Sequence, residues 1–101
     1  MNLNQIHNVY FIGIGGIGMS ALARYFKSIG KEVAGYDKTP TDITADLETL
    51  GIAIHFEDSI NAIPKDFNVE NTLVVITPAV PNYHSEWNYF IERGFTIKKR
   101  A

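Results

Sequence analysis

Four glycines gather within six positions near the start of the chain, at Gly13, Gly15, Gly16 and Gly18. Three of them fit the pattern G-x-G-x-x-G. In this pattern the first glycine allows a tight turn, the second lets the backbone approach a pyrophosphate, and the third lets a helix pack closely on a strand. A helix that begins here presents free N–H groups and the positive end of its dipole to an anion. The spacing therefore predicts a diphosphate-binding turn that needs no basic side chain.

An acidic residue stands at the distance that this pattern requires. Asp37 lies 19 positions after Gly18 and ends an apolar run, where a carboxylate can accept hydrogen bonds from ribose hydroxyls. Glycine-rich turns are common, so a tight turn without a ligand is the alternative interpretation. The full context favours a nucleotide, because the glycines follow an apolar run and precede a stretch with helical spacing.

The elements that must position these residues alternate between strands and helices. Apolar, β-branched runs predict strands over residues 8–12, 32–36, 52–56, 72–76 and 95–98. Helical spacing and capping residues predict helices over 17–29, over 43–50 and from 84 or 85 to 93, with one helical turn at 60–63. This alternation predicts an α/β, Rossmann-like three-layer domain with a five-stranded parallel sheet in the order 3-2-1-4-5.

That strand order places the first and fourth strands side by side. Ligands of such sheets bind outside the carboxyl ends of the strands, at the point where the strand order reverses. The loop after the fourth strand, Thr77-Pro78-Ala79-Val80-Pro81, should therefore face the glycine turn. Asp37 should lie at the same edge.

Composition narrows the classes of partner. The chain has 101 residues, a net charge of −2 and no cysteine, which fits one small domain without disulfides or thiolate metal sites. Only Lys98-Lys99-Arg100 forms a basic run, so we expect no nucleic acid partner. No apolar run approaches a membrane span, and the first residues lack the features of a signal peptide. We expect no membrane partner and a cytoplasmic localisation.

The segment from Phe11 to Ser20, FIGIGGIGMS, closely resembles the opening of the UDP-N-acetylmuramate–L-alanine ligases, a group of Mur ligases. Gly35-Tyr36-Asp37, the segment from Val74 to Pro81 and Lys99-Arg100-Ala101 are similar to that group too, in the same order. The resemblance covers essentially the whole chain, but only the first domain of the family. It implies that this domain, residues 1–101, binds UDP-N-acetylmuramate.

The resemblance also implies a role for particular residues. It places the diphosphate on the glycine turn and the helix start, assigns Asp37 to the ribose, and makes the loop after the fourth strand the opposite wall of the crevice. The implied substrate-binding residues are Gly13, Gly15, Gly16, Gly18, Met19, Ser20, Asp37, Thr77, Pro78, Ala79 and Val80. Ser20 could equally bond to its own helical turn.

Enzymes of this family use ATP to activate the muramoyl carboxylate, which the amine of alanine then attacks. Their ATP-binding domain carries a lysine-bearing phosphate loop, Gly-x-x-x-x-Gly-Lys-Thr, which this sequence lacks. The resemblance therefore implies that the ATP-binding and C-terminal domains are absent from this chain. We expect ATP, Mg²⁺ and L-alanine to belong to the full-length enzyme, and the fragment to be inactive, with no catalytic residue, no metal site and no cofactor bound.

One position departs from the family. Many relatives have Gly-His shortly after the third strand, with the histidine near the uracil, whereas this chain has Glu57-Asp58. His55 is a poor substitute because it lies within the predicted strand. Three alternative functions stay open at this point: a ligase of the same family that recycles murein tripeptide, the NAD-binding domain of an oxidoreductase, and a nucleotide-sensing module without chemistry.

Overall fold

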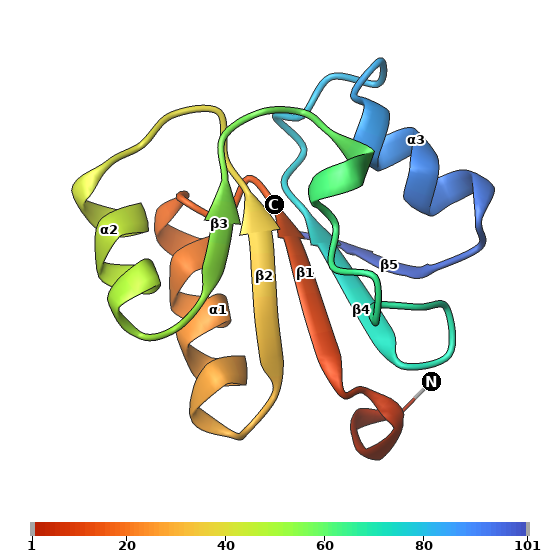
Figure 1. Ribbon diagram of the computed structural model, residues 1–101, viewed down its shortest axis with the longest axis horizontal. Helices are drawn as coiled ribbons and strands as arrows, with labels where there is room; N and C mark the ends of the chain where they lie inside the picture. The colour runs from red at the N-terminus through yellow and green to blue at the C-terminus, as the bar shows by residue number, and fades with distance from the viewer. Residues whose placement is uncertain (1, 101) are drawn as a thin grey trace.

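Five parallel strands form one sheet at the centre of the fold (Figure 1). The computed structural model describes residues 2–100, so Met1 and Ala101, the last residue of the Lys99-Arg100-Ala101 motif, lie outside the described residues. The strands are β1 (Asn8–Ile12), β2 (Glu32–Tyr36), β3 (Ala53–His55), β4 (Thr72–Ile76) and β5 (Thr96–Lys99). The helices are α1 (Ile17–Ser28), α2 (Asp42–Thr49) and α3 (Ser85–Glu92), with short 3₁₀ turns η1 (Leu3–Gln5) and η2 (Ile60–Ala62).

The strand order is β3-β2-β1-β4-β5, which confirms the predicted Rossmann-like arrangement. Strand β1 lies between β2 and β4, and its last residue, Ile12, pairs with Tyr36 on one side and Ile76 on the other. All four pairings are parallel. The carboxyl ends of β1, β2 and β4 therefore reach the same edge of the sheet.

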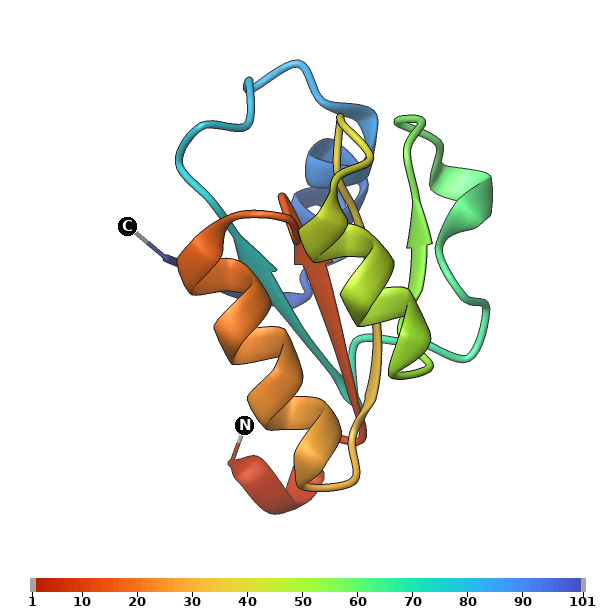
Figure 2. The same cartoon turned by 90° about the vertical axis from the view of Figure 1, so that its left-hand side faces the viewer.

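Side chains of β1 alternate between two cores, one on each face of the sheet. Val9 and Phe11 pack with α1 and α2, whereas Tyr10 and Ile12 pack with Phe90 of α3. Figure 2 shows α1 and α2 together on one side of the sheet and α3 on the other. All five residues of β1 are buried, as expected for a central strand of a parallel sheet.

Most element boundaries follow local signals in the sequence. Thr41 begins α2 with a capping box to Thr44, and His84 is the N-cap of α3. Several predicted boundaries were wrong by one residue: α1 ends at Ser28, α2 covers 42–49, α3 ends at Glu92, β3 covers only 53–55, and β5 covers 96–99. Phe95 leaves the strand because its side chain is buried against Phe90.

One further element was missed. Asn2 and Gln5 form a capping box that starts the 3₁₀ turn η1. Among residues 2–100, no helix combines the length and the apolar character that crossing a bilayer requires.

Candidate functional site

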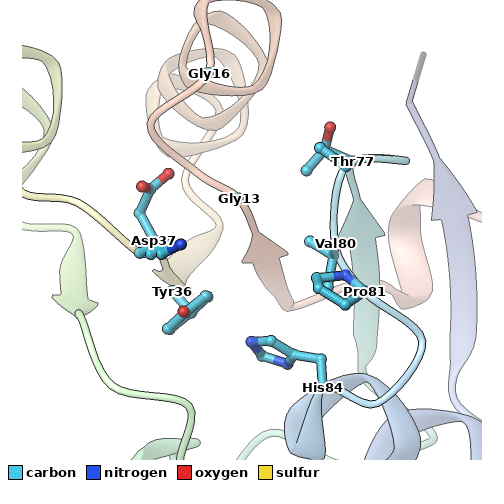
Figure 3. A pocket seen from close by; sticks show the side chains of 10 residues that line it. Gly13, Gly16, Tyr36, Asp37, Thr77, Val80, Pro81 and His84 are labelled. Atoms are coloured by element: carbon cyan, nitrogen blue, oxygen red, sulfur yellow. The ribbon is translucent and has the colours of Figure 1, made fainter.

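A cavity of about 350 Å³ opens where the carboxyl ends of β1, β2 and β4 meet (Figure 3). Its size falls in the range of small-molecule sites, and it lies at the point where the strand order reverses. The residues that line it are Gly13, Gly16, Tyr36, Asp37, Lys38, Thr77, Ala79, Val80, Pro81 and His84. The structure therefore brings the glycine turn, Asp37 and the loop after β4 together, as the sequence predicted.

The glycine turn is fixed from both neighbouring strands. The N–H groups of Gly13 and Ile14 both donate to the carbonyl oxygen of Tyr36, at 2.8 and 3.0 Å. Gly13 has a φ of +91°, a conformation that other residues adopt with strain. A Cβ at this position would also overlap the methyl group of Thr77. Gly13 is thus required both by the backbone conformation and by the close approach of the β4 loop.

Asp37 holds the middle of the turn. Its Oδ2 accepts a hydrogen bond from the N–H of Gly15 at 2.7 Å, and its Oδ1 accepts from the N–H of Thr39 at 3.0 Å. A carboxylate has about four acceptor positions, so two remain for further donors. A Cβ at Gly15 would lie 2.7 Å from the same Oδ2. In this structure, the second glycine of the pattern makes room for Asp37.

The first turn of α1 offers donors to an anion. Gly16 is the N-cap and has no side chain to bond to the helix. Among the described residues, no acceptor pairs with the N–H groups of Ile17, Gly18 and Met19. Three free N–H groups and the positive end of a 12-residue helix therefore lie beside the cavity.

The remaining predicted site residues lie away from the cavity lining. The side chain of Met19 belongs to the core under α1, and the hydroxyl of Ser20 donates to the carbonyl oxygen of Ile17 at 3.0 Å. Both side chains are buried, so only their backbone could meet a ligand at the start of α1. Pro78 lies on the β4 loop but borders a neighbouring hollow.

The sequence model described as "Mur ligase family, catalytic domain" matches residues 8–101. The chain belongs to the Mur ligase family. UDP-N-acetylmuramate–L-alanine ligase of Flavobacterium psychrophilum is 76% identical over 101 residues, covering 100% of this chain and 22% of the relative. The protein of the same name from Flavobacterium johnsoniae is 73% identical with the same coverage.

Solved structures of Mur ligases share the fold of this domain. UDP-N-acetylmuramate-alanine ligase MurC from Thermotoga maritima has a TM-score of 0.81 at 36% identity, over 92% of this chain and 20% of that one. A UDP-N-acetylmuramate:L-alanyl-γ-D-glutamyl-meso-diaminopimelate ligase from Neisseria meningitides has a TM-score of 0.79 at 23% identity, over 93% of this chain and 28% of that one, and shows the fold alone. The chain spans about a fifth of the length of the curated relatives named above.

Arg100 is a neighbour of the site that the sequence analysis missed. The three nearest atoms that a Cβ at Gly18 would meet all belong to the Arg100 guanidinium, the closest at 3.1 Å. The prediction that Gly18 serves close helix–strand packing in this Mur ligase domain was therefore wrong. A cation is unfavourable beside the N-terminus of a helix, so a bound anion would relieve this arrangement. The sequence signals were the basic run 98–100 and the similarity of Lys99-Arg100-Ala101 to the family, neither of which places Arg100 beside Gly18.

Asp58, one of the two residues that depart from the pattern expected for the family, binds the start of α3. Its carboxylate accepts from the N–H of Ser85 at 2.8 Å and from the N–H of Glu86 at 3.1 Å, and it lies 3.2 Å from His84 Nδ1. Desolvation raises the pKa of Asp58, but the two backbone N–H groups and His84 outweigh it and lower the pKa below its usual 3.8. Asp58 is thus ionised at neutral pH.

Glu86 is a charged residue with no exposed surface beneath the site. Its carboxylate accepts from the hydroxyl of Tyr10 and from the N–H of Ser59 at 3.1 Å, and lies 2.7 Å from His55 Nε2. Burial, followed by the charge of Glu86, strongly raises the pKa of Tyr10, which stays protonated as a donor. The network joins β1, β3 and α3. No pattern in the sequence indicates this network, because a glutamate is ordinarily exposed and seldom fully buried.

Proposed function

We propose that this chain is the UDP-N-acetylmuramate-binding domain of an ATP-dependent ligase that adds L-alanine to UDP-N-acetylmuramate in peptidoglycan synthesis. The observation that carries the proposal is the cavity between the glycine turn and the β4 loop, with three free N–H groups at the start of α1. Two relatives that are more than 70% identical over the whole of this chain carry the name UDP-N-acetylmuramate–L-alanine ligase, which supports the proposal.

The residues of the chain would bind and orient the nucleotide. The N–H groups of Ile17, Gly18 and Met19 would donate to the diphosphate, with the Arg100 guanidinium beside them. Asp37, already fixed by Gly15, would accept from the ribose hydroxyls. Thr77, Pro78, Ala79 and Val80 would form the wall across the crevice.

The described residues do not fit Mg²⁺-ATP. The glycine turn carries no lysine, and no three histidine, aspartate or glutamate side chains within residues 2–100 gather to hold a metal ion. The proposed role of this domain is therefore to bind and orient the substrate. ATP, Mg²⁺ and L-alanine are proposed to bind the other domains of the full-length enzyme, which lie outside residues 1–101.

The high identity to named alanine ligases favours this function over the tripeptide-recycling ligase, whose solved relative is only 23% identical. Membership of the Mur ligase family likewise disfavours an NAD-dependent oxidoreductase. The cytoplasmic localisation stays a prediction from the sequence.

Calorimetric titration of the purified chain with UDP-N-acetylmuramate, UDP and NADH tests the proposal. We expect saturable binding of both UDP compounds at one site and weaker or no binding of NADH. Tighter binding of NADH than of either UDP compound would refute the ligase assignment.

A further inference from the structure

His84 carries a ring nitrogen without a partner. Its Nε2 is buried and, among the described residues, makes no hydrogen bond, while the side chain as a whole is 7% exposed. A buried polar atom left unpaired in a native structure requires an explanation, such as an absent ligand. The ring borders the cavity, and Figure 3 shows it projecting from the start of α3 toward Tyr36.

The other ring nitrogen determines what Nε2 can do. Nδ1 lies 3.2 Å from Asp58 Oδ1 and 3.5 Å from the backbone nitrogen of Trp87. The two contacts compete, because the carboxylate needs a donor and the Trp87 N–H needs an acceptor. The shorter contact, to the charged carboxylate, dominates and places the proton on Nδ1. In the neutral imidazole Nε2 then bears a lone pair and acts as an acceptor.

The Tyr36 ring covers this acceptor. Its ring lies edge-on to the His84 ring, with the centroids 4.7 Å apart. Tyr36 is the last residue of β2 and is half-buried, and its hydroxyl makes no hydrogen bond within residues 2–100. Its ring packs against the core cluster that includes Tyr10 and lies 5.8 Å from the His55 ring, but no hydrogen bond within residues 2–100 fixes it, so it can turn aside when a planar ring enters the cavity.

We propose that His84 reads the base of the nucleotide, with Nε2 accepting the N3–H of uracil once Tyr36 turns aside. This inference rests on the proposed function and adds a specificity residue to the same site. Cytosine has a lone pair at N3, which would face the lone pair of Nε2. A site built around one hydrogen bond discriminates strongly against a ligand that cannot make it. The crevice should therefore select uridine over cytidine nucleotides.

The substitution His84→Asn removes the proposed contact with the base but keeps a residue that can cap α3. Asparagine is a good N-cap, so His84→Asn supplies an acceptor for the Trp87 N–H but has no atom at the position of Nε2. Tyr83→Ala is the matched control, because Tyr83 is the adjacent residue, is 80% exposed and lies outside the cavity lining. Affinities of the wild-type chain and both variants for UDP and CDP are measured by calorimetry, with thermal melts.

We expect the wild-type chain to bind UDP at least about tenfold more tightly than CDP. CDP lacks the hydrogen bond to Nε2 and brings its own N3 lone pair against that of the ring nitrogen. His84→Asn should bind UDP about three- to tenfold more weakly and lose the preference, while Tyr83→Ala keeps both. An unchanged ratio of UDP to CDP affinity in a folded His84→Asn chain would overturn the inference and leave the proposed function intact. Failure of the wild-type chain to bind any uridine nucleotide would overturn both.

If His84→Asn does not fold, a second measurement on the wild-type chain decides. The ¹⁵N resonance of His84 Nε2 should move on addition of UDP, because the lone pair accepts a hydrogen bond in the complex. A resonance unaffected by saturating UDP would contradict the proposed contact.

Discussion

The carboxylate of Asp37 accepts a hydrogen bond from the backbone N–H of Gly15 at 2.7 Å, so two parts of the nucleotide-binding pattern that lie 22 positions apart are in direct contact. A Cβ on Gly15 would lie 2.7 Å from Asp37 Oδ2 and 3.2 Å from the Thr44 methyl group. The backbone of Gly15 does not adopt a positive φ. The second glycine is needed here because of the space that Asp37 and Thr44 occupy, before any ligand binds.

Gly15→Val should therefore displace Asp37 and abolish UDP binding, while the domain still folds. We expect affinity to fall by more than about tenfold and stability by about 1–3 kcal/mol, measured by titration and urea unfolding. Gly16→Ala is the control for stability, because a Cβ there meets nothing closer than 3.6 Å, and it should lose less than about 1 kcal/mol. If Gly15→Val bound UDP like the wild type, the turn would not hold a phosphate.

Gly13 and Gly18 should respond very differently to substitution. Gly13→Ala forces a side chain into a positive φ and against Thr77, so we expect a loss of at least about 2 kcal/mol in the free energy of unfolding. Gly18→Val meets the flexible end of Arg100, and the loss should stay within about 1 kcal/mol. Urea unfolding of both variants tests this ranking. A Gly18 variant less stable than the Gly13 variant would restore the helix–strand packing role.

Glu86→Ala should be the most destabilising of these substitutions. It leaves the Tyr10 hydroxyl, the Ser59 N–H and His55 without their common partner in a buried site, at a cost of about 3–5 kcal/mol. Tyr10→Phe removes a single donor and should cost about 1 kcal/mol. Chemical denaturation measures both, and equal effects would show that the network does not depend on Glu86.

Asp58 should make stability depend on acid pH. Its pKa is lower in the folded chain than its usual 3.8, so the folded state gains from the ionised form above that pH. The gain should be fully present at neutral pH and disappear as the pH falls from 3.8 through the lowered pKa. The difference in stability between the wild type and Asp58→Asn should therefore be largest above pH 4 and shrink in stronger acid. A difference that grows on acidification would contradict the assignment.

The fold was predictable because its signals are local. The apolar run from Thr72 to Ile76 and the glycine after each helix mark elements by residue type alone, and their alternation determines a parallel sheet. The position of the cavity followed from the strand order. Boundaries failed where packing decides, as at Phe95, whose ring joins the core instead of extending β5.

Individual partners within the site were not predictable in the same way. Asp37 was assigned to a ribose, but its contact with Gly15 depends on how β1 and β2 are joined in space. Arg100 reaches Gly18 from the far end of the chain, and Glu86 meets Tyr10 across 76 positions. Such contacts between polar side chains leave no periodic pattern in a sequence.

The central claim, that the glycine turn and the start of α1 hold the diphosphate of UDP-N-acetylmuramate, is tested most directly by amide chemical shifts. On titration with this ligand, the N–H resonances of Ile17, Gly18 and Met19 should shift first, together with those of the β4 loop. Amides at the opposite edge of the sheet, such as Glu70 and Asn71 before β4, should stay unchanged. Shifts at Gly13–Ser20 produced by NADH at lower concentration than by UDP-N-acetylmuramate, or no shift at α1, would contradict the claim.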